Sequence, residues 1–199
     1  MLGFDIETTG LLSDAQARIS VVCTVETQTG SERVYNFMAA SCEAGRTQLR
    51  NDLVGEMNAA VSLCAYNAVL FDIPFLQREL QISDQEVQCW LLKLFDPFHA
   101  MKTTFNVTSK LNAMLALNGL SSKSGSGGDA VEMAKNREWE SLTRYCMDDV
   151  RLTLALAVKP ELILFGDQEF LFCIARFPSL RFCVCLVDSS ERVLQSDGG

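Results

Sequence analysis

Five side chains in this sequence have the types and spacing needed to hold divalent cations beside a water molecule. Asp5 and Glu7 stand two residues apart in an alternating apolar and acidic segment, so a strand would point both carboxylates to one side. Asp72 stands where a loop gives way to a helical pattern. Asp149 follows Tyr145 by four residues in a long helical pattern, which places both on one face. Carboxylate oxygens are the ligands that Mg²⁺ and Mn²⁺ prefer.

The pair of acidic residues at the start has a simpler interpretation as well. Two like charges side by side repel each other, and a divalent cation between them would remove that cost. An edge strand with a solvated acidic face would produce the same pattern in Asp5 and Glu7. Asp149 favours the cation, because an aspartate among apolar neighbours such as Cys146 and Val150 is hard to explain by packing.

The elements that must position these side chains follow from the periodicity of the chain. Three strands with short links come first and predict an antiparallel meander. Strands and helices then alternate, which predicts an α/β fold with a mixed sheet, three antiparallel strands followed by two parallel ones, and helices on both faces. The expected strands are 4–7, 19–25, 32–37, 61–66 and 87–95. The expected helices are 43–60, 73–80, 110–117, 130–135 and 138–157.

The 199 residues are enough for one domain with a sizeable core and an appendage. We expect the domain to span residues 1–165 and a C-terminal extension to span 166–199. Two apolar runs in the extension, 170–177 and 182–187, predict either a hairpin or a partly exposed strand, and a surface where a protein partner could bind. The Ser- and Gly-rich segment 121–128 is expected to be a loop.

Composition restricts the class of function. A net charge of −8, from 17 basic and 25 acidic residues, is atypical of a protein that binds nucleic acid by charge alone. Eight cysteines without paired spacing, and a single histidine, His99, argue against a structural zinc site and for reduced cysteines. Neither a signal peptide nor an apolar run of about 18 residues is visible, so we expect an intracellular protein, cytoplasmic or nuclear, that binds no membrane.

Three motifs, in order, resemble those of the DEDD superfamily of 3′→5′ exonucleases, which have a ribonuclease H-like fold. The first motif is similar to residues 4–10 (FDIETTG), the second to 67–76 (NAVLFDIPFL) and the third to 145–150 (YCMDDV). A tyrosine four residues before the last aspartate marks the DEDDy subgroup. The DEDDh subgroup carries a histidine five residues before that aspartate, where this chain has Arg144. The resemblance covers residues 1–158.

The resemblance implies phosphodiester hydrolysis by two ions, Mg²⁺ or Mn²⁺, about 4 Å apart. Asp5 would bridge both ions. Glu7 and Asp149 would complete the site of the ion that activates water, and Asp72 would act on the second ion. Tyr145 would position the attacking water. The products would be nucleoside 5′-monophosphates, released one at a time from the 3′ end of a nucleic acid that is single-stranded or frayed.

The resemblance also implies substrate contacts at the ends of two strands. The backbone at Thr8 and Thr9 would meet the terminal 3′-hydroxyl, and Leu11 would pack against the last base. Asn67 and Phe71 would lie along the bound strand, because the residues that follow a strand line the ligand site in open α/β sheets.

Three questions stay open at the level of sequence. Lys123 could reach a phosphate from its loop, although a solvated lysine is the simpler interpretation. An inactive exonuclease fold that binds nucleic acid or a protein would carry a similar sequence, but the presence of all four carboxylates and the tyrosine favours an enzyme. DNA and RNA are not distinguished, because no residue indicates contact with a 2′-hydroxyl.

Overall fold

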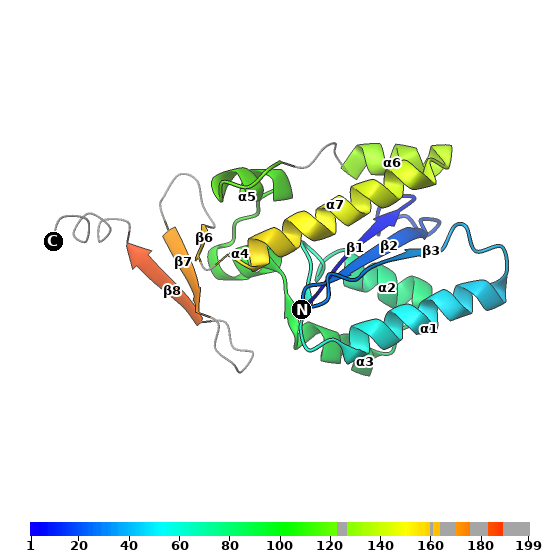
Figure 1. Cartoon of the computed structure of the whole chain (residues 1–199), viewed down its shortest axis with the longest axis horizontal. Helices are drawn as coiled ribbons and strands as arrows, with labels where there is room; N and C mark the ends of the chain where they lie inside the picture. The colour runs from blue at the N-terminus through cyan, green and yellow to red at the C-terminus, as the bar shows by residue number, and fades with distance from the viewer. Residues whose placement is uncertain (123–126, 160, 164–169, 176–182, 189–199) are drawn as a thin grey trace.

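A five-stranded mixed sheet forms the centre of the computed structural model, which describes residues 1–122, 127–159, 161–163, 170–175 and 183–188. Helices lie on both faces of this sheet (Figure 1). The strands are β1 (Leu2–Thr8), β2 (Ile19–Glu26), β3 (Glu32–Asn36), β4 (Leu63–Cys64) and β5 (Leu94–Phe95), in the spatial order β3-β2-β1-β4-β5.

The direction of the strands confirms the predicted ribonuclease H-like sheet. β1 pairs with β2, and β2 with β3, in antiparallel fashion. β4 pairs in parallel with β1 on one side and with β5 on the other. The parallel pairing of β1 ends at Gly3, opposite Cys64, whereas its antiparallel pairing continues to Thr8, opposite Ile19. The second half of β1 therefore has a strand partner on one side only.

Two groups of helices cover the two faces of the sheet. The first group packs on Phe4 and Ile6, and it comprises α1 (Glu43–Ala59), α2 (Asp72–Leu80) and α3 (Asp84–Leu91). The second group packs on Val21 and Cys23, and it comprises α4 (Pro97–Phe105), α5 (Leu111–Leu117), α6 (Gly127–Asn136) and α7 (Trp139–Ala157). None of the described helices is long and apolar enough to cross a membrane.

The expected strand over 87–95 is wrong. Residues Asp84–Leu91 form helix α3, and only Leu94–Phe95 pair as β5. A capping box starts the helix: Ser83 Oγ accepts from the backbone N–H of Glu86, and the Glu86 carboxylate accepts from the N–H of Ser83. The two buried residues of α3 stand three apart, as one face of a helix requires. The apolar residues continue from the helix into the strand, so the sequence gives no sign of where the helical period ends.

The sequence does not predict helix α4, because an Asp-Pro pair after an apolar run is typical of the end of a strand. Asp96 is the N-cap of α4, and its Oδ1 accepts from the N–H of His99 at 3.1 Å. Pro97 takes the first helical position, where its missing N–H costs nothing. The same pair of residues therefore ends β5 and begins a helix.

Three expected helix starts also differ from the structure. Phe71, not Asp72, is the N-cap of α2. Lys110 is the N-cap of α5, in place of the expected Thr108–Ser109 cap. α6 begins at Gly127, so Asp129 lies inside its first turn rather than before it.

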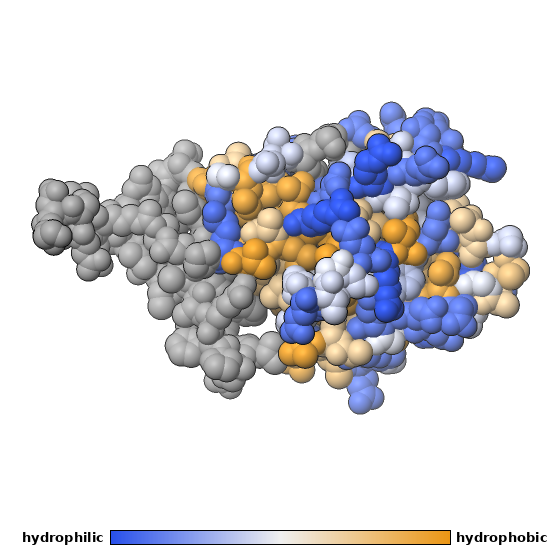
Figure 2. Space-filling view, viewed as in Figure 1, coloured by the Kyte–Doolittle hydropathy of each residue, from blue (hydrophilic) through white to orange (hydrophobic). Residues whose placement is uncertain are grey.

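A second, separate sheet follows α7. It is antiparallel and contains β6 (Glu161–Ile163), β7 (Phe170–Ala175) and β8 (Cys183–Asp188) in that order. β7 and β8 pair as the hairpin alternative for 170–177 and 182–187 requires. Figure 1 shows this sheet beside the end of α7, next to α4 and α5. In Figure 2, hydrophobic side chains gather on the described surface next to that sheet, and hydrophilic and hydrophobic ones are mixed at the far end.

Candidate metal and nucleic-acid site

Two of the predicted carboxylates meet a thiol beneath α7. Asp5 and Glu7 stand on β1 opposite Cys23 and Val21, and they face α7 because residues two apart in a strand share a face. The ligand atoms of Asp5, Glu7 and Cys146 all lie within 4.8 Å of one another. The Cys146 thiol donates to the carbonyl oxygen of Asp5 at 3.3 Å. The middle of α7 is thereby fixed against the acidic strand.

Asp72 reaches the same strand from its open edge. β4 ends at Cys64, so the N–H of Ile6 has no partner in that strand. Asp72 Oδ1 accepts from this N–H at 3.2 Å. The carboxylate is buried, and it stands at the first residue of α2. The short length of β4 therefore lets a helix N-terminus insert a carboxylate beside Ile6, the residue between Asp5 and Glu7.

Burial raises the pKa of Asp72 to about 8, and the nearby negative charges of Asp96 and Asp149 add to this shift. The N–H of Ile6 acts in the opposite direction, because it stabilises the charged form. Buried carboxylates that repel one another in this way are typical of sites that a cation completes.

Tyr145 and Asp149 lie on the same buried face of α7. Their exposed fractions are 6% and 7%, whereas Arg144 is exposed. Cys146, which contacts Asp5, stands between them in sequence. The charge of Asp149 acts on Asp72, so the third motif approaches the second motif as well as the first.

The turn after β1 is held by its own side chains. Thr8 Oγ1 donates to the carbonyl of Gly10 at 2.7 Å. Thr9 closes the following loop twice: its N–H donates to the carbonyl of Arg18, and its Oγ1 accepts from the N–H of Arg18, both at 2.9 Å. Leu11 stands on this loop with 68% of its surface exposed. A large apolar side chain is thus presented to solvent beside the acidic strand.

The loop before α2 also has a defined geometry. Asn67 adopts a left-handed backbone conformation, with φ of 66°, which asparagine tolerates better than most residues. Its N–H donates to Asp96 Oδ1 at 2.9 Å, and its carbonyl accepts from the N–H of Phe71. The Phe71 ring packs on Phe75, with centroids 5.0 Å apart. Lys123 lies outside the described residues.

Asp96 was missed as a site residue. It is buried at the end of β5, where it accepts hydrogen bonds from the N–H groups of Asn67, Val69 and His99. One carboxylate thus fixes the loop before α2, begins α4 and contributes negative charge near Asp72. The available signal was its position, an aspartate directly after a parallel strand and directly before a proline.

Cys146 was missed as well. Sequence reasoning treated it as an apolar neighbour of Asp149, yet its sulfur stands beside the carboxylates of Asp5 and Glu7. Its place next to Tyr145, on the inner side of the third motif, was the only signal. A sulfur atom is a softer ligand than the oxygens that Mg²⁺ prefers.

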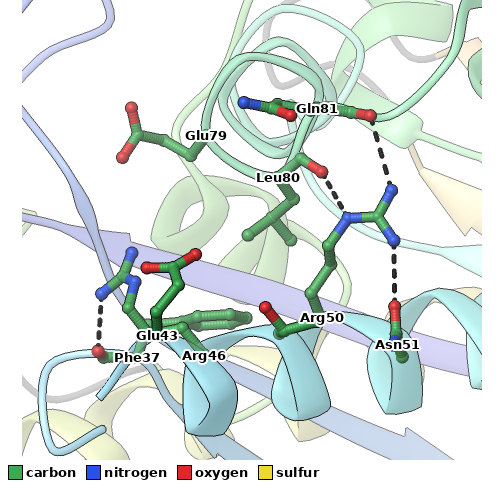
Figure 3. Close-up of a pocket in the computed structure, with 9 residues that line it drawn as sticks. Phe37, Glu43, Arg46, Arg50, Asn51, Glu79, Leu80 and Gln81 are labelled. Atoms are coloured by element: carbon green, nitrogen blue, oxygen red, sulfur yellow. Dashed lines mark hydrogen bonds between the residues drawn. The ribbon is translucent and has the colours of Figure 1, made fainter. Parts of the chain in front are cut away.

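A separate cavity of about 340 Å³ lies on the other group of helices, between α1 and the end of α2 (Figure 3). Arg46 donates there to the carbonyl of Phe37, and Arg50 donates to the carbonyls of Leu80 and Gln81. None of the nine residues in this cavity is a predicted site residue. Its arginines tie α1 to its neighbours.

Comparison with known families agrees with the fold. The family model described as the RNase_H superfamily matches residues 2–159, so the chain belongs to this superfamily of nucleases. No protein with curated function matches the chain. The chain is thus an RNase H-like domain with an acidic cluster suited to metal.

The acidic cluster fits a divalent cation by the chemistry of its donors. Asp5 and Glu7 supply oxygen ligands on one face, and Asp72 and Asp149 add two further carboxyl groups nearby. A cation would offset the repulsion that raises the pKa of Asp72. RNase H-like nucleases use divalent metals, and this arrangement of side chains suits them.

Proposed function

We propose that this chain is a metal-dependent 3′→5′ exonuclease of the DEDDy subgroup, which removes nucleoside 5′-monophosphates from the 3′ end of DNA or RNA. The main support is the convergence of three motifs: Asp5 and Glu7 face α7, Asp72 holds the open edge of the same strand, and α7 brings Tyr145 and Asp149. A buried acidic cluster at the ends of strands is costly to keep unless it binds a ligand.

In this proposal the site binds two ions, Mg²⁺ or Mn²⁺. When bound, the ions lower the pKa of the attacking water and stabilise the charge on the leaving oxygen. Asp5 would hold both ions. Glu7 and Asp149 would hold the ion on the side of the water, and Asp72 would hold the other. Tyr145 orients the water through its hydroxyl, since it lies one helical turn from Asp149 on the same face.

The substrate strand would enter beside the acidic cluster, along the two loops that follow β1 and β4. Five described residues would contact it: Thr8, Thr9, Leu11, Asn67 and Phe71. The exposure of Leu11 supports a contact with the last base, because a base would cover this apolar side chain. Lys123 stays an expectation.

The test is digestion of 3′-labelled single- and double-stranded DNA and RNA with Mg²⁺ or Mn²⁺. Asp5→Ala and Asp149→Ala should each abolish digestion while circular dichroism shows an intact fold. Undiminished digestion by Asp149→Ala protein would refute the assignment. A wild-type protein that digests none of these substrates would instead point to an inactive fold used for binding.

We also propose that the exonuclease domain ends with α7. The expected boundary at residue 165 falls between β6 and β7, but these strands pair with each other. The family match ends at residue 159, just before β6. The second sheet would then belong to the extension, which would offer a surface to a protein partner.

The chemistry of the cysteines supports an intracellular location. Disulfides are rare where the cell keeps thiols reduced. Cys23, Cys42, Cys64, Cys89 and Cys146 are free thiols.

A further inference from the structure

We propose that Arg78 is a positioning residue, which fixes the loop 11–18 and thereby sets how tightly the site holds the 3′-terminal nucleotide. The inference rests on the exonuclease function proposed above and deepens it. Arg78 lies on α2, the helix that begins with Asp72, but it belongs to none of the three motifs.

The Arg78 guanidinium converges on three carbonyl oxygens of this loop. Nη1 donates to Leu12 at 3.0 Å and to Asp14 at 3.4 Å, and Nη2 donates to Ala17 at 2.7 Å. The group also lies over the Phe75 ring, 4.5 Å from its centroid. Five N–H donors in one plane suit such a set of acceptors, which a lysine could not match.

These contacts contribute to the position of the loop. It contains turns but neither helix nor strand. Its two ends are joined by the paired hydrogen bonds between Thr9 and Arg18. Arg18 also forms an ion pair with Glu79 of α2 at 3.5 Å. Leu12 and Ala17 pack on the core cluster that includes α2, and Arg78 adds the hydrogen bonds that join the middle of the loop to this helix.

The position of Leu11 connects this attachment of the loop to binding of the substrate strand. It stands at the start of the loop with 68% of its surface exposed. A side chain that packs on a base contributes more affinity when the protein already holds it in place, because less entropy is lost on binding. Arg78 should therefore affect binding of the strand. Among the described residues its polar partners are loop carbonyls and Glu79, and none of these is a candidate metal ligand.

The experiment compares Arg78→Met with Arg50→Met. Methionine keeps an apolar chain of similar length over Phe75 but removes every donor. Arg50 is a matched control, because it also donates to carbonyls at the end of α2, those of Leu80 (2.6 Å) and the C-cap Gln81 (3.4 Å), but does so from α1 (Figure 3). Both variants lose comparable hydrogen bonds.

Three quantities are measured for each protein. The first is the dissociation constant for single-stranded DNA and RNA with a 3′-hydroxyl, with Ca²⁺ in place of Mg²⁺. The second is kcat and KM for digestion of the same strands with Mg²⁺ or Mn²⁺. The third is amide hydrogen exchange over residues 11–18. Arg78→Met should weaken binding and raise KM about tenfold, equivalent to about 1.4 kcal/mol, with kcat within about twofold of wild type. Exchange in the loop should accelerate.

The control and the conservative variant complete the prediction. Arg50→Met should leave all three quantities near wild type. Arg78→Lys should recover part of the affinity, because an ammonium can still reach a loop carbonyl.

The outcomes separate this inference from the proposed function. Unchanged affinity and KM in Arg78→Met would overturn the inference alone, and so would a loss of kcat at constant KM. A wild-type protein that binds the strand but never digests it would overturn the exonuclease, while the affinity of Arg78→Met would still decide the role of Arg78. Failure of the wild type to bind any strand would overturn both.

Discussion

The carboxyl group of Asp72 would link metal binding to folding if it holds an ion as proposed. Its pKa rises from the ordinary value of 3.8 to about 8, chiefly because it is buried. Between these values the folded, metal-free protein binds a proton that the unfolded chain does not bind. Stability without metal must therefore fall as the pH rises through this range.

We predict this slope in urea unfolding of the metal-free protein between about pH 4 and pH 8, with a limit of about 1.4 kcal/mol per pH unit for one proton. Asp72→Asn should remove most of the slope, since an amide does not titrate. Added Mg²⁺ or Mn²⁺ should stabilise the wild type most at the upper end of the range. A slope that persists in Asp72→Asn would mean that another group takes up the proton.

Tyr145 supports a second prediction at this scale. In the proposed mechanism its hydroxyl orients water and holds no metal. Tyr145→Phe should therefore slow single-turnover digestion about tenfold to a hundredfold, because correct placement of a reacting group is worth factors of this size. Titration with Mn²⁺ should give an unchanged affinity. An unchanged rate would remove Tyr145 from the mechanism.

At the scale of elements, the packing surface between β1 and α7, here called the seam, determines whether the carboxylates on these two elements lie close together. Gly3 lies in this seam, and a Cβ atom there would stand 2.6 Å from Leu154 Cγ of α7. Both residues are buried, so a methyl group must displace the Leu154 side chain within the packing between β1 and α7. α7 carries Asp149, and β1 carries Asp5.

Gly3→Ala should thus destabilise the protein by about 1–3 kcal/mol and reduce digestion more than the loss of folded protein explains. Gly55→Ala is the control, because nothing lies within 4 Å of a Cβ at this site in α1, and it should stabilise by about 0.5–1 kcal/mol. Urea unfolding and activity per folded molecule test both variants. Full activity in Gly3→Ala would show that the seam tolerates a larger separation.

The elements also show which parts of the site a sequence can reveal. The alternation around Asp5 and the helical spacing of Tyr145 and Asp149 are local patterns, and the chain follows them. Asp96 and Arg78 act on backbone amides and carbonyls of distant loops. Nearly every residue type has a backbone amide and carbonyl, so the pattern of side chains in a sequence does not predict such contacts.

The sheet order was predictable for a related reason. Three strands with short links can only form a meander, and the parallel strands that follow need helical connections. The run 87–95 failed because a buried apolar segment fits a strand or a helix equally well until its cap is recognised. For the second sheet, the sequence offers only two apolar runs, which correspond to β7 and β8. The sequence does not predict the remaining strand, β6.

At the scale of the whole molecule, the net charge of −8 would make the ions part of the binding surface in the proposed exonuclease. We predict that chelation with EDTA abolishes binding of single strands, because the acidic cluster would then repel phosphate. Binding with Ca²⁺ should depend only weakly on NaCl concentration, since few Lys or Arg side chains release counterions. Fluorescence anisotropy over a salt series tests both statements. Tight binding in EDTA would show that the protein holds the strand without metal.

Helix α2 has a consequence for the geometry of cutting. It begins with Asp72 and carries Arg78 six residues later, a rise of about 9 Å. One rigid element thus contacts both the strand that carries Asp5 and Glu7 and the loop that would lie under the last base in the proposed exonuclease. It serves as a spacer of fixed length: if α2 shifts against β1, both contacts shift together and their separation stays constant. An inserted residue between the two would move Arg78 by about 1.5 Å and turn it by about 100°. The loop would then release the terminal nucleotide while the acidic cluster remained intact.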